Sequence, residues 1–364
     1  MLTKNQQNTK KSLVVAITVL FIVGCSSTDD AAQQNNVNFD HELYDGKPTL
    51  GLSNDFPPET AQEAIARGDK AYREKDTDLA LYEYIRALSF PSQDQADQAF
   101  YKIGYIHQQR GNYELAKLAY NRASFINKNN TQYAAAVGIV ELKLGEHENA
   151  KMHLLHSIKM DQKRQGNKNW DPDKDILSRD LVIDSASPIS AYIGLGIIAD
   201  LDAQHKHAQQ IYLTALKVNS KSYKALTNLG YSYYLDGNLP QAEAVNRKAT
   251  TLYPSAKRGW SNLGLIYIKD RRYEDALDAL SNVMPREKAL NDIGYFSMLE
   301  GDYEASVLYL EKAINTSPTF YAKAQKNLKR AKKLQISAPP VKLSNNANNT
   351  QTQATVYSIT DTRH

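Results

Sequence analysis

The chain has 364 residues, of which 42% are hydrophobic and 23% charged, as is ordinary for a folded soluble protein. Its 44 basic and 40 acidic residues give a formal net charge of +4, and this near balance argues against a nucleic-acid-binding protein, which needs a strongly basic face. The single cysteine excludes an internal disulfide.

The first 24 residues have the composition of a secretory signal peptide. Lys10 and Lys11 precede an apolar run, 12–23, whose 12 residues are too few to cross a bilayer stably but suit the hydrophobic region of a leader. Gly24 and Cys25 follow directly. Three lysines and no acid precede Cys25, so much of the net positive charge belongs to this leader.

The residues around Cys25 resemble a bacterial lipobox, with the sequence Ile-Val-Gly-Cys at 22–25. The resemblance implies cleavage of residues 1–24, diacylglycerol on the Cys25 sulfur, and stable anchoring by acyl chains such as palmitate. Ser26 stands where lipoproteins retained in the inner membrane carry Asp, which implies the outer membrane and a protein facing the periplasm. The alternative is an ordinary signal peptide in which the cysteine is incidental.

A polar stretch rich in Asn, Gln and Asp follows Cys25 and shows no helical periodicity. We expect residues 25–56 to form a flexible, lipidated tether. Pro57 and Pro58 end this stretch, and Glu59 opens the first helix.

Five glycines recur with a fixed spacing over the middle of the chain. They are Gly104, Gly138, Gly196, Gly230 and Gly264. Neighbouring members are 34, 58, 34 and 34 residues apart, and a constant period of this length is typical of a solenoid of helical hairpins. The longer interval equals one period plus 24 residues, which places an insert at 165–188.

This spacing resembles the 34-residue tetratricopeptide repeat (TPR), in which a small residue at position 8 lets the two helices of a hairpin approach closely. A glycine inside a helix costs about 1 kcal/mol relative to alanine, so its return at one phase indicates a repeated close contact. Seven units fit the template, at 61–94, 97–130, 131–164, 189–222, 223–256, 257–284 and 287–320. The resemblance implies an all-α TPR superhelical solenoid of about seven helix-turn-helix repeats. The sixth unit is short, since Gly264 and Gly294 are 30 residues apart.

The register of the repeats predicts the domain order after the tether. The segments are TPR units 1–3 at 57–164, an insert at 165–188, and TPR units 4–7 with a C-terminal capping helix at 189–335. We expect the insert to contain a short helix at 173–183 and to separate two sub-stacks. The tail at 336–364 is polar and expected to be disordered, with a short strand at 354–360 as an alternative that forms on binding.

A groove for a partner is expected on the first helices of units 5–7. In the TPR family this groove is lined by template positions 2, 5, 6, 9, 12 and 13. Position 2 is basic in three successive units and position 6 is asparagine in two. Cationic, amide and aromatic groups together suit an extended segment with acidic side chains or a C-terminal carboxylate. Unless they are simply solvated residues of a helix face, the groove residues are Lys224, Asn228, Tyr231, Arg258, Asn262, Lys288, Asn291 and Tyr295.

The sequence offers no arrangement suited to catalysis or to a metal ion. His41 begins a motif that lacks the second histidine of a zinc-protease helix, and His153 and His156 have no cysteine or placed carboxylate to complete a site. The stretch 171–175 resembles a calcium loop that fails at its glycine position. We therefore expect a protein that is not an enzyme, with no metal, no cofactor other than the covalent lipid, and no small-molecule substrate.

Together these features resemble the TPR lipoproteins of tight-adherence (Flp) pilus assembly, which share the lipobox, the repeat array and an ending like Ala-Lys-Ala-Gln-Lys-Asn-Leu at 322–328. The resemblance implies an outer-membrane-anchored scaffold that binds protein partners during assembly of a pilus or secretion apparatus. A secretin or another pilus component would be the partner, in a pilotin-like role. The alternative is a TPR lipoprotein that regulates or scaffolds peptidoglycan or polysaccharide assembly.

Overall fold

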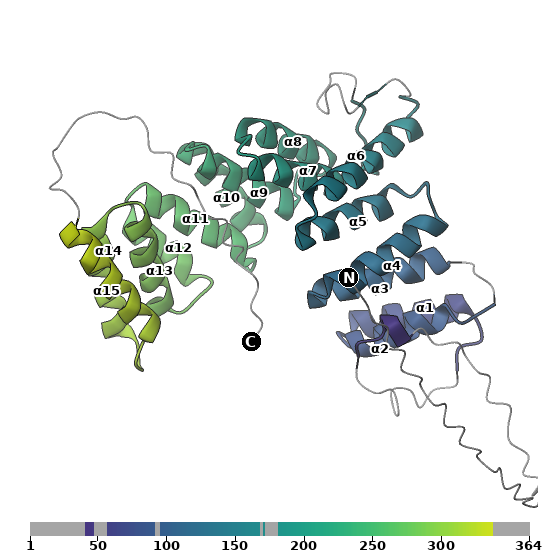
Figure 1. The fold of residues 1–364 in the computed structure, drawn as a ribbon, viewed down its shortest axis with the longest axis horizontal. Coiled ribbons are helices and arrows are strands. Elements are labelled where there is room, and N and C mark those ends of the chain that lie inside the picture. Colours follow the sequence, from purple (N-terminus) through teal and green to yellow (C-terminus); the bar gives the residue numbers. More distant parts are fainter. Residues whose placement is uncertain (1–40, 47–56, 92–94, 168–169, 172–180, 338–364) are drawn as a thin grey trace, which may run out of the picture. The chain divides into compact units, whose positions relative to one another are not determined.

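The computed structural model describes residues 41–46, 57–91, 95–167, 170–171 and 181–337. These residues form fifteen α-helices and one 3₁₀ turn, η1 (His41–Leu43), with no β-strand among them (Figure 1). The expected all-α fold is confirmed. The signal peptide with Cys25, most of the tether, most of the helix expected at 173–183, and the strand expected at 354–360 lie outside the described residues.

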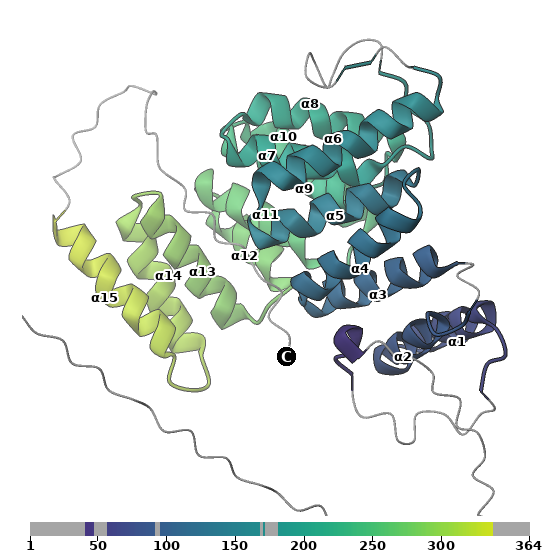
Figure 2. The ribbon, with the colours of Figure 1, turned by 45° about the vertical axis from the view of Figure 1, so that its right-hand side comes forward.

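Fourteen helices pair into seven hairpins, each made of a first helix (A) and a second helix (B) in contact, and the hairpins stack in chain order (Figure 1 and Figure 2). Hairpins one to three are α1 (Ala61–Arg73) with α2 (Thr77–Ala87), α3 (Ala96–Arg110) with α4 (Tyr113–Ile126), and α5 (Thr131–Leu144) with α6 (His147–Arg164). Hairpins four to seven are α7 (Ile189–Leu201) with α8 (His205–Val218), α9 (Tyr223–Leu235) with α10 (Leu239–Leu252), α11 (Lys257–Lys269) with α12 (Tyr273–Ser281), and α13 (Arg286–Leu299) with α14 (Tyr303–Thr316). The last helix, α15 (Ala322–Ser337), packs against α14 as the expected cap.

The sixth hairpin differs from its neighbours in its second helix. α12 has nine residues, whereas α10 and α14 have 14 each. Pro285 directly precedes α13, with the φ of −58° that its ring imposes at the start of a helix. The short interval between Gly264 and Gly294 is therefore taken up by the second helix of this hairpin.

The two sub-stacks expected on either side of the insert are one continuous stack. α7 contacts both α5 and α6, and a single core cluster joins Leu154 of α6 to Tyr192 of α7 and Ile211 of α8. The end of the insert is fastened to α6, because the Gln162 Nε2 donates to the Val182 carbonyl at 2.7 Å and the Gln162 Oε1 accepts from the Val182 N–H at 3.0 Å. The core thus continues from α6 to α7 across the insert, and Trp170 of the insert belongs to it.

The recurring glycines lie where the two helices of a hairpin come closest. A Cβ atom added to Gly104 would lie 2.7 Å from Cδ1 of Tyr120, and one added to Gly196 would lie 2.4 Å from Cε1 of Tyr212, both closer than atoms can approach. The same relation holds in every hairpin, for Gly68–Tyr84, Gly104–Tyr120, Gly138–Leu154, Gly196–Tyr212, Gly230–Asn246, Gly264–Leu280 and Gly294–Leu310. The close helix contact predicted from the glycine period is confirmed.

Every A–B loop contains one residue in the left-handed backbone region. Glycine fills that position in four hairpins, at Gly111, Gly145, Gly237 and Gly301. The other three carry a side chain there, at Lys75, Ala203 and Arg271, with φ of 67°, 57° and 59°. The left-handed conformation costs an L-residue roughly 1–2 kcal/mol, so these three loops are strained and the geometry of the hairpin overrides local preference.

The structure differs from the expected free tether at residues 41–46, which we call the clasp. Leu43 is completely buried in the core cluster of the first two hairpins. Its carbonyl accepts a hydrogen bond of 2.9 Å from Nε2 of the buried His107 on α3. Asp45 forms an ion pair with Arg110 and accepts a hydrogen bond from Asn112. A lone leucine in a polar stretch gives no periodic signal, so sequence alone could not separate the clasp from the tether.

Two loop substitutions, alanine to glycine in one hairpin and glycine to alanine in the next, test whether a side chain strains the left-handed position. We expect Ala203→Gly to stabilise the protein by roughly 0.5–1 kcal/mol, because the relief of left-handed strain exceeds the extra entropy that glycine gives the unfolded chain. Gly237→Ala in the next hairpin should destabilise it by about 1 kcal/mol for the converse reason. Thermal unfolding of both variants is the measurement, and shifts of the same sign would contradict the account.

The pH dependence of the clasp tests its contact with His107. Burial lowers the pKa of His107 and outweighs the Leu43 carbonyl and the charge of Asp45, which both raise it, so the folded protein is stabilised by the neutral ring. The stabilisation is therefore present above the ordinary histidine pKa of about 6.5 and is lost as the pH falls toward the lowered value of the folded state. Hydrogen-exchange protection at Leu43 and Asp45 should fall between pH 7.5 and 5. His107→Gln retains a donor for the Leu43 carbonyl but does not titrate, and an unchanged pH dependence in this variant would refute the assignment.

Candidate functional site

The first helices of the hairpins form a continuous surface, which we call the A-helix face. α5, α7, α9, α11 and α13 contribute to it, because each of these helices contacts the next A helix in the series. Equal template positions of successive units therefore lie near one another on this face. The candidate groove residues belong to α9, α11 and α13.

Lys224 of α9 and Arg258 of α11 lie in adjacent hairpins with exposed side chains. The Arg258 Nη2 donates a hydrogen bond of 2.6 Å to Oδ1 of Asn228. Asn228 is 5% exposed, so its carbonyl oxygen fixes the guanidinium from below while the other nitrogens of Arg258 stay accessible. Asn228 was predicted to bind a partner directly. Its amide instead orients Arg258, the cation that would bind the partner.

Lys143 of α5 joins these two cations and was not among the residues singled out from the sequence. The Lys143 side chain is exposed, but partial desolvation by the groups around it lowers its pKa, and the charges of Arg258 and Lys224 lower it further. Among the described residues, no carboxylate lies within ion-pair distance of Lys143, Lys224 or Arg258. We call these three side chains the cation triad. Like charges gathered without a counter-ion disfavour one another, so a bound anion would relieve the repulsion.

Tyrosines lie beside the triad. The rings of Tyr231 and Tyr234 stack with centroids 5.7 Å apart, and the Lys269 ammonium lies 4.7 Å from the Tyr234 centroid. Burial raises the pKa of Tyr231, and the charge of Arg258 acts on it in the opposite direction. The phenols therefore stay neutral at physiological pH and offer the A-helix face flat apolar surface next to positive charge.

Lys288 and Asn291 of α13 belong to a different environment. Asn291 is completely buried, donates from Nδ2 to Oδ1 of Asp292 at 3.0 Å, and accepts at 3.0 Å from Nδ2 of Asn327 in the cap helix. Burial raises the pKa of Asp292, whereas Lys323 and the exposed Lys288 favour its charged form. Lys288 therefore has a carboxyl group nearby, unlike the members of the triad. Tyr295, also on α13, is partly buried and packs edge-on against its neighbour Phe296.

Asn262 of α11 is turned toward the interior rather than toward solvent. It is 5% exposed, and its Nδ2 donates at 3.0 Å both to the Thr227 carbonyl and to Oδ1 of Asn246. Asn246 in turn donates to the Ala242 carbonyl at 2.8 Å. These bonds use both amide hydrogens of Asn262 to link the fifth and sixth hairpins, so a partner backbone would compete with them.

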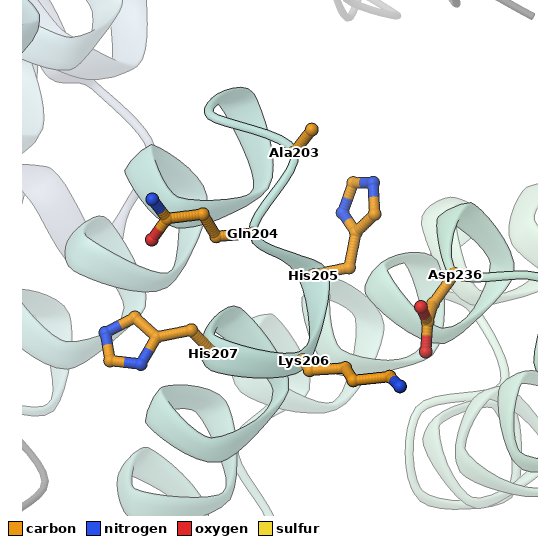
Figure 3. A pocket seen from close by; sticks show the side chains of 6 residues that line it. All are labelled: Ala203, Gln204, His205, Lys206, His207 and Asp236. Atoms are coloured by element: carbon orange, nitrogen blue, oxygen red, sulfur yellow. The ribbon is translucent and has the colours of Figure 1, made fainter. Parts of the chain in front are cut away.

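The histidines do not assemble into a metal site. His153 bonds through Nδ1 to Oε2 of Glu141 at 2.8 Å, and no group of three or more potential ligands exists in the part of the chain that the structure describes. A shallow pocket at the start of α8 contains His205 and His207, but Figure 3 shows their rings extending in different directions, with His207 pointing away from Asp236.

A serine, a carboxylate and a histidine meet beneath this pocket. The Ser232 hydroxyl donates to Oδ1 of Asp200 at 2.7 Å, and Nδ1 of His205 lies 3.0 Å from the same oxygen. The Tyr212 hydroxyl donates to the other oxygen at 3.0 Å. In a hydrolase triad the histidine stands between serine and carboxylate, whereas here the carboxylate stands between serine and histidine. The cluster is arranged to hold the fourth A–B loop against α9.

No described helix is long and apolar enough to cross a membrane. Of the residues predicted from sequence, the structure brings Lys224, Asn228, Tyr231 and Arg258 together. It places Asn262 and Asn291 inside the stack. Lys143 could have been found from its template position, which is position 13 of the third unit. It was missed because we expected the insert to place the third unit in a separate sub-stack from the groove.

Comparison with known proteins identifies the repeats. Tetratricopeptide repeat family models match residues 97–130, 204–257 and 287–320. A cell division cycle protein 27 homolog of Caenorhabditis elegans is 30% identical over 115 residues, a match that covers 32% of this chain and only 14% of that protein.

Similar solved structures include a tetratricopeptide repeat protein from Parabacteroides merdae, with 16% identity, a TM-score of 0.49 and coverage of 76% of this chain and 100% of that one. PilF of Pseudomonas aeruginosa has 17% identity, a TM-score of 0.44 and coverage of 65% and 99%, respectively. PilW, described as a type IV pilus biogenesis factor, has 13% identity, a TM-score of 0.47 and coverage of 75% and 100%. The family models show that the chain contains tetratricopeptide repeats, and its hairpins form the all-α solenoid of such repeats.

Proposed function

We propose that the protein is a non-enzymatic scaffold that holds an extended acidic segment, or a C-terminal carboxylate, of a protein partner on its A-helix face. The cation triad carries this proposal, since the charges of Lys224 and Arg258 act on Lys143 and no carboxylate in the described residues lies within ion-pair distance of the three. Charge-assisted hydrogen bonds to a carboxylate are roughly twice as strong as neutral ones.

The shape of the site favours an extended segment over a compact ligand. The triad members lie on α5, α9 and α11 of the third, fifth and sixth hairpins, so a ligand that meets all of them must extend along the A-helix face. The stacked Tyr231 and Tyr234 extend the site beyond the charges and suit an apolar or aromatic side chain of the same segment. Lys288 and Tyr295 would contact the segment only if it continued onto α13.

The proposed location is the periplasmic side of the outer membrane. The lipobox-like sequence ending at Cys25 and the following Ser26 support it. Two or more acyl chains on Cys25 would make the anchor stable, because each buried CH₂ contributes about 0.8 kcal/mol. The repeat array would then present its A-helix face to partners at the membrane.

We further propose that the partner belongs to a pilus or secretion apparatus, with a secretin and a pilotin-like role for this chain as the specific form. The support is the combination of lipobox, repeats and the ending at 322–328. Part of that ending has a structural role as well, since Ala324 is buried and Asn327 bonds to Asn291. Scaffolding of peptidoglycan or polysaccharide assembly is the second candidate, and the identity of the captured partner decides between them.

Neutralising the triad should prevent capture of the partner. We expect Lys143, Lys224 and Arg258, all changed to Gln, to lower partner recovery at least tenfold, because each charge-assisted contact contributes about 1.5–3 kcal/mol. The measurement is crosslinking and mass spectrometry after purification from detergent-solubilised envelopes. The control variant has Lys151, Lys159 and Lys163 on α6 changed to Gln. It removes the same charge from exposed positions and should leave partner recovery unchanged. Lys288→Gln should have a smaller effect, since Asp292 already lies nearby.

Equal recovery of the partner by the triad variant and the α6 control would refute the proposal that the cation triad binds the partner. Crosslinks that map to α9 and α11 of the unaltered protein would locate the partner on the A-helix face, and crosslinks confined to other surfaces would contradict the proposal even if recovery fell.

The anchor makes a separate prediction. Cys25→Ser removes the sulfur that would carry diacylglycerol, so the protein should no longer incorporate labelled palmitate. It should also leave the outer-membrane fraction. Retention of both the label and the outer-membrane fractionation by the variant would overturn the lipoprotein assignment without bearing on the triad.

A further inference from the structure

The outer face of the cap helix α15 carries charge of one sign only. Its sequence contains six basic residues and no acidic one. Ala324 and Ala331 are buried against the preceding hairpin, and the face opposite them is exposed and basic. One of the six, Lys332, pairs with Glu311 of α14 at 2.7 Å, and Lys323 acts on Asp292. The remaining four, which we call the basic stripe, are Lys326, Lys329, Arg330 and Lys333.

The basic stripe has no ion-pair partner in the described part of the chain. Its members are three or four residues apart, so they project from one side of the helix. A cap needs a polar outer face, but either sign of charge meets that need. At the other end of the stack, the charged residues of α1 are of both signs, and Arg67 pairs with Glu63 at 2.6 Å. Solubility alone therefore does not account for a single sign on α15.

Two large exposed apolar side chains lie near the two ends of α15 in the sequence. Phe320 precedes α15 and is 80% exposed, and Ile336 lies in its last turn and is 85% exposed. Ile336 is three residues beyond Lys333, so it belongs to the same side of the helix as the stripe. Exposed apolar groups beside lysines are the pattern of a surface that contacts lipid, since long basic side chains reach the headgroups while apolar groups enter the boundary below them.

We propose that the basic stripe of α15 binds the surface of a membrane rich in anionic phospholipid. Charge complementarity supplies the attraction, and Phe320 and Ile336 supply short-range apolar contacts. A lipid surface fits better than an acidic protein, because the exposed Ile336 on the side of the charges suits the boundary between headgroups and acyl chains. The proposal does not depend on the A-helix face or on lipid at Cys25, and it gives the far end of the repeat array a membrane contact of its own.

The test is co-sedimentation of the full chain carrying Cys25→Ser with vesicles of phosphatidylcholine, with or without 30% phosphatidylglycerol (roughly the range in which charge attraction is strong). Each lysine or arginine near an anionic surface contributes about fivefold to partitioning. Changing Lys326, Lys329, Arg330 and Lys333 to Gln should therefore lower partitioning onto anionic vesicles by at least about 50-fold, even without full additivity. Glutamine has nearly the helix propensity of lysine, so α15 should persist.

The matched control changes Lys151, Lys159, Lys163 and Lys248 to Gln, which removes the same charge from exposed positions of α6 and α10. It should bind anionic vesicles within about threefold of the unaltered protein, with the salt dependence retained. Binding to pure phosphatidylcholine measures any contribution of the leader, which is common to all variants.

Three outcomes would overturn the proposal: no preference for anionic vesicles, equal loss in the control, or full binding by the stripe variant. Retention of the protein on heparin but not on anionic vesicles would also overturn it and would indicate a polyanionic macromolecule instead. A further variant that carries both Phe320→Ser and Ile336→Ser should bind anionic vesicles more weakly, with an unchanged salt dependence. This result would separate the contribution of the apolar contacts from that of the charges.

Discussion

The close approach of the two helices in each hairpin is the constraint on which the rest of the structure depends. A glycine of the A helix faces a side chain sixteen residues later on the B helix, and no Cβ would fit between them. This contact fixes the distance between the helices, and the left-handed residue in the loop fixes how the chain turns. The hairpin geometry is strict enough that Ala203 and Arg271 adopt a backbone conformation that their side chains disfavour.

Because the hairpins are alike, the A helices pack side by side, and the face they form gains its chemistry from several units, with Lys224 and Arg258 at equal template positions and Lys143 at a different one. The continuity of the core across residues 165–188 is what allows Lys143, before the insert, to act on Lys224 and Arg258 after it. The cation triad is therefore a product of stacking rather than of any one repeat. The same stacking turns Asn262 inward, where its amide links two hairpins.

The sequence predicted what the repeat period dictates and missed what depends on single contacts. The glycines located the hairpins, the shortened sixth unit and the cap, because these features recur or break a recurrence. Lys143 was missed because chain separation concealed its proximity to the later units. The inward turn of Asn262 depends on its neighbour Asn246, whose position on α10 carries a Tyr or Leu in the other hairpins, as at Tyr212. Leu43 was missed because one buried leucine leaves no pattern.

The clasp has a mechanical consequence. Cys25 and His41 are sixteen positions apart, so the chain between them reaches at most about 55 Å when fully extended. Force applied through an anchor at Cys25 would reach the clasp before it reached α1. Leu43 and Asp45 bond to α3 and its following loop, and Leu43 also packs in the core of the first hairpin, so the first two hairpins share the load. The first hairpin, which has a neighbour on one side only, therefore does not carry the load alone, and the array resists being peeled apart from its own end.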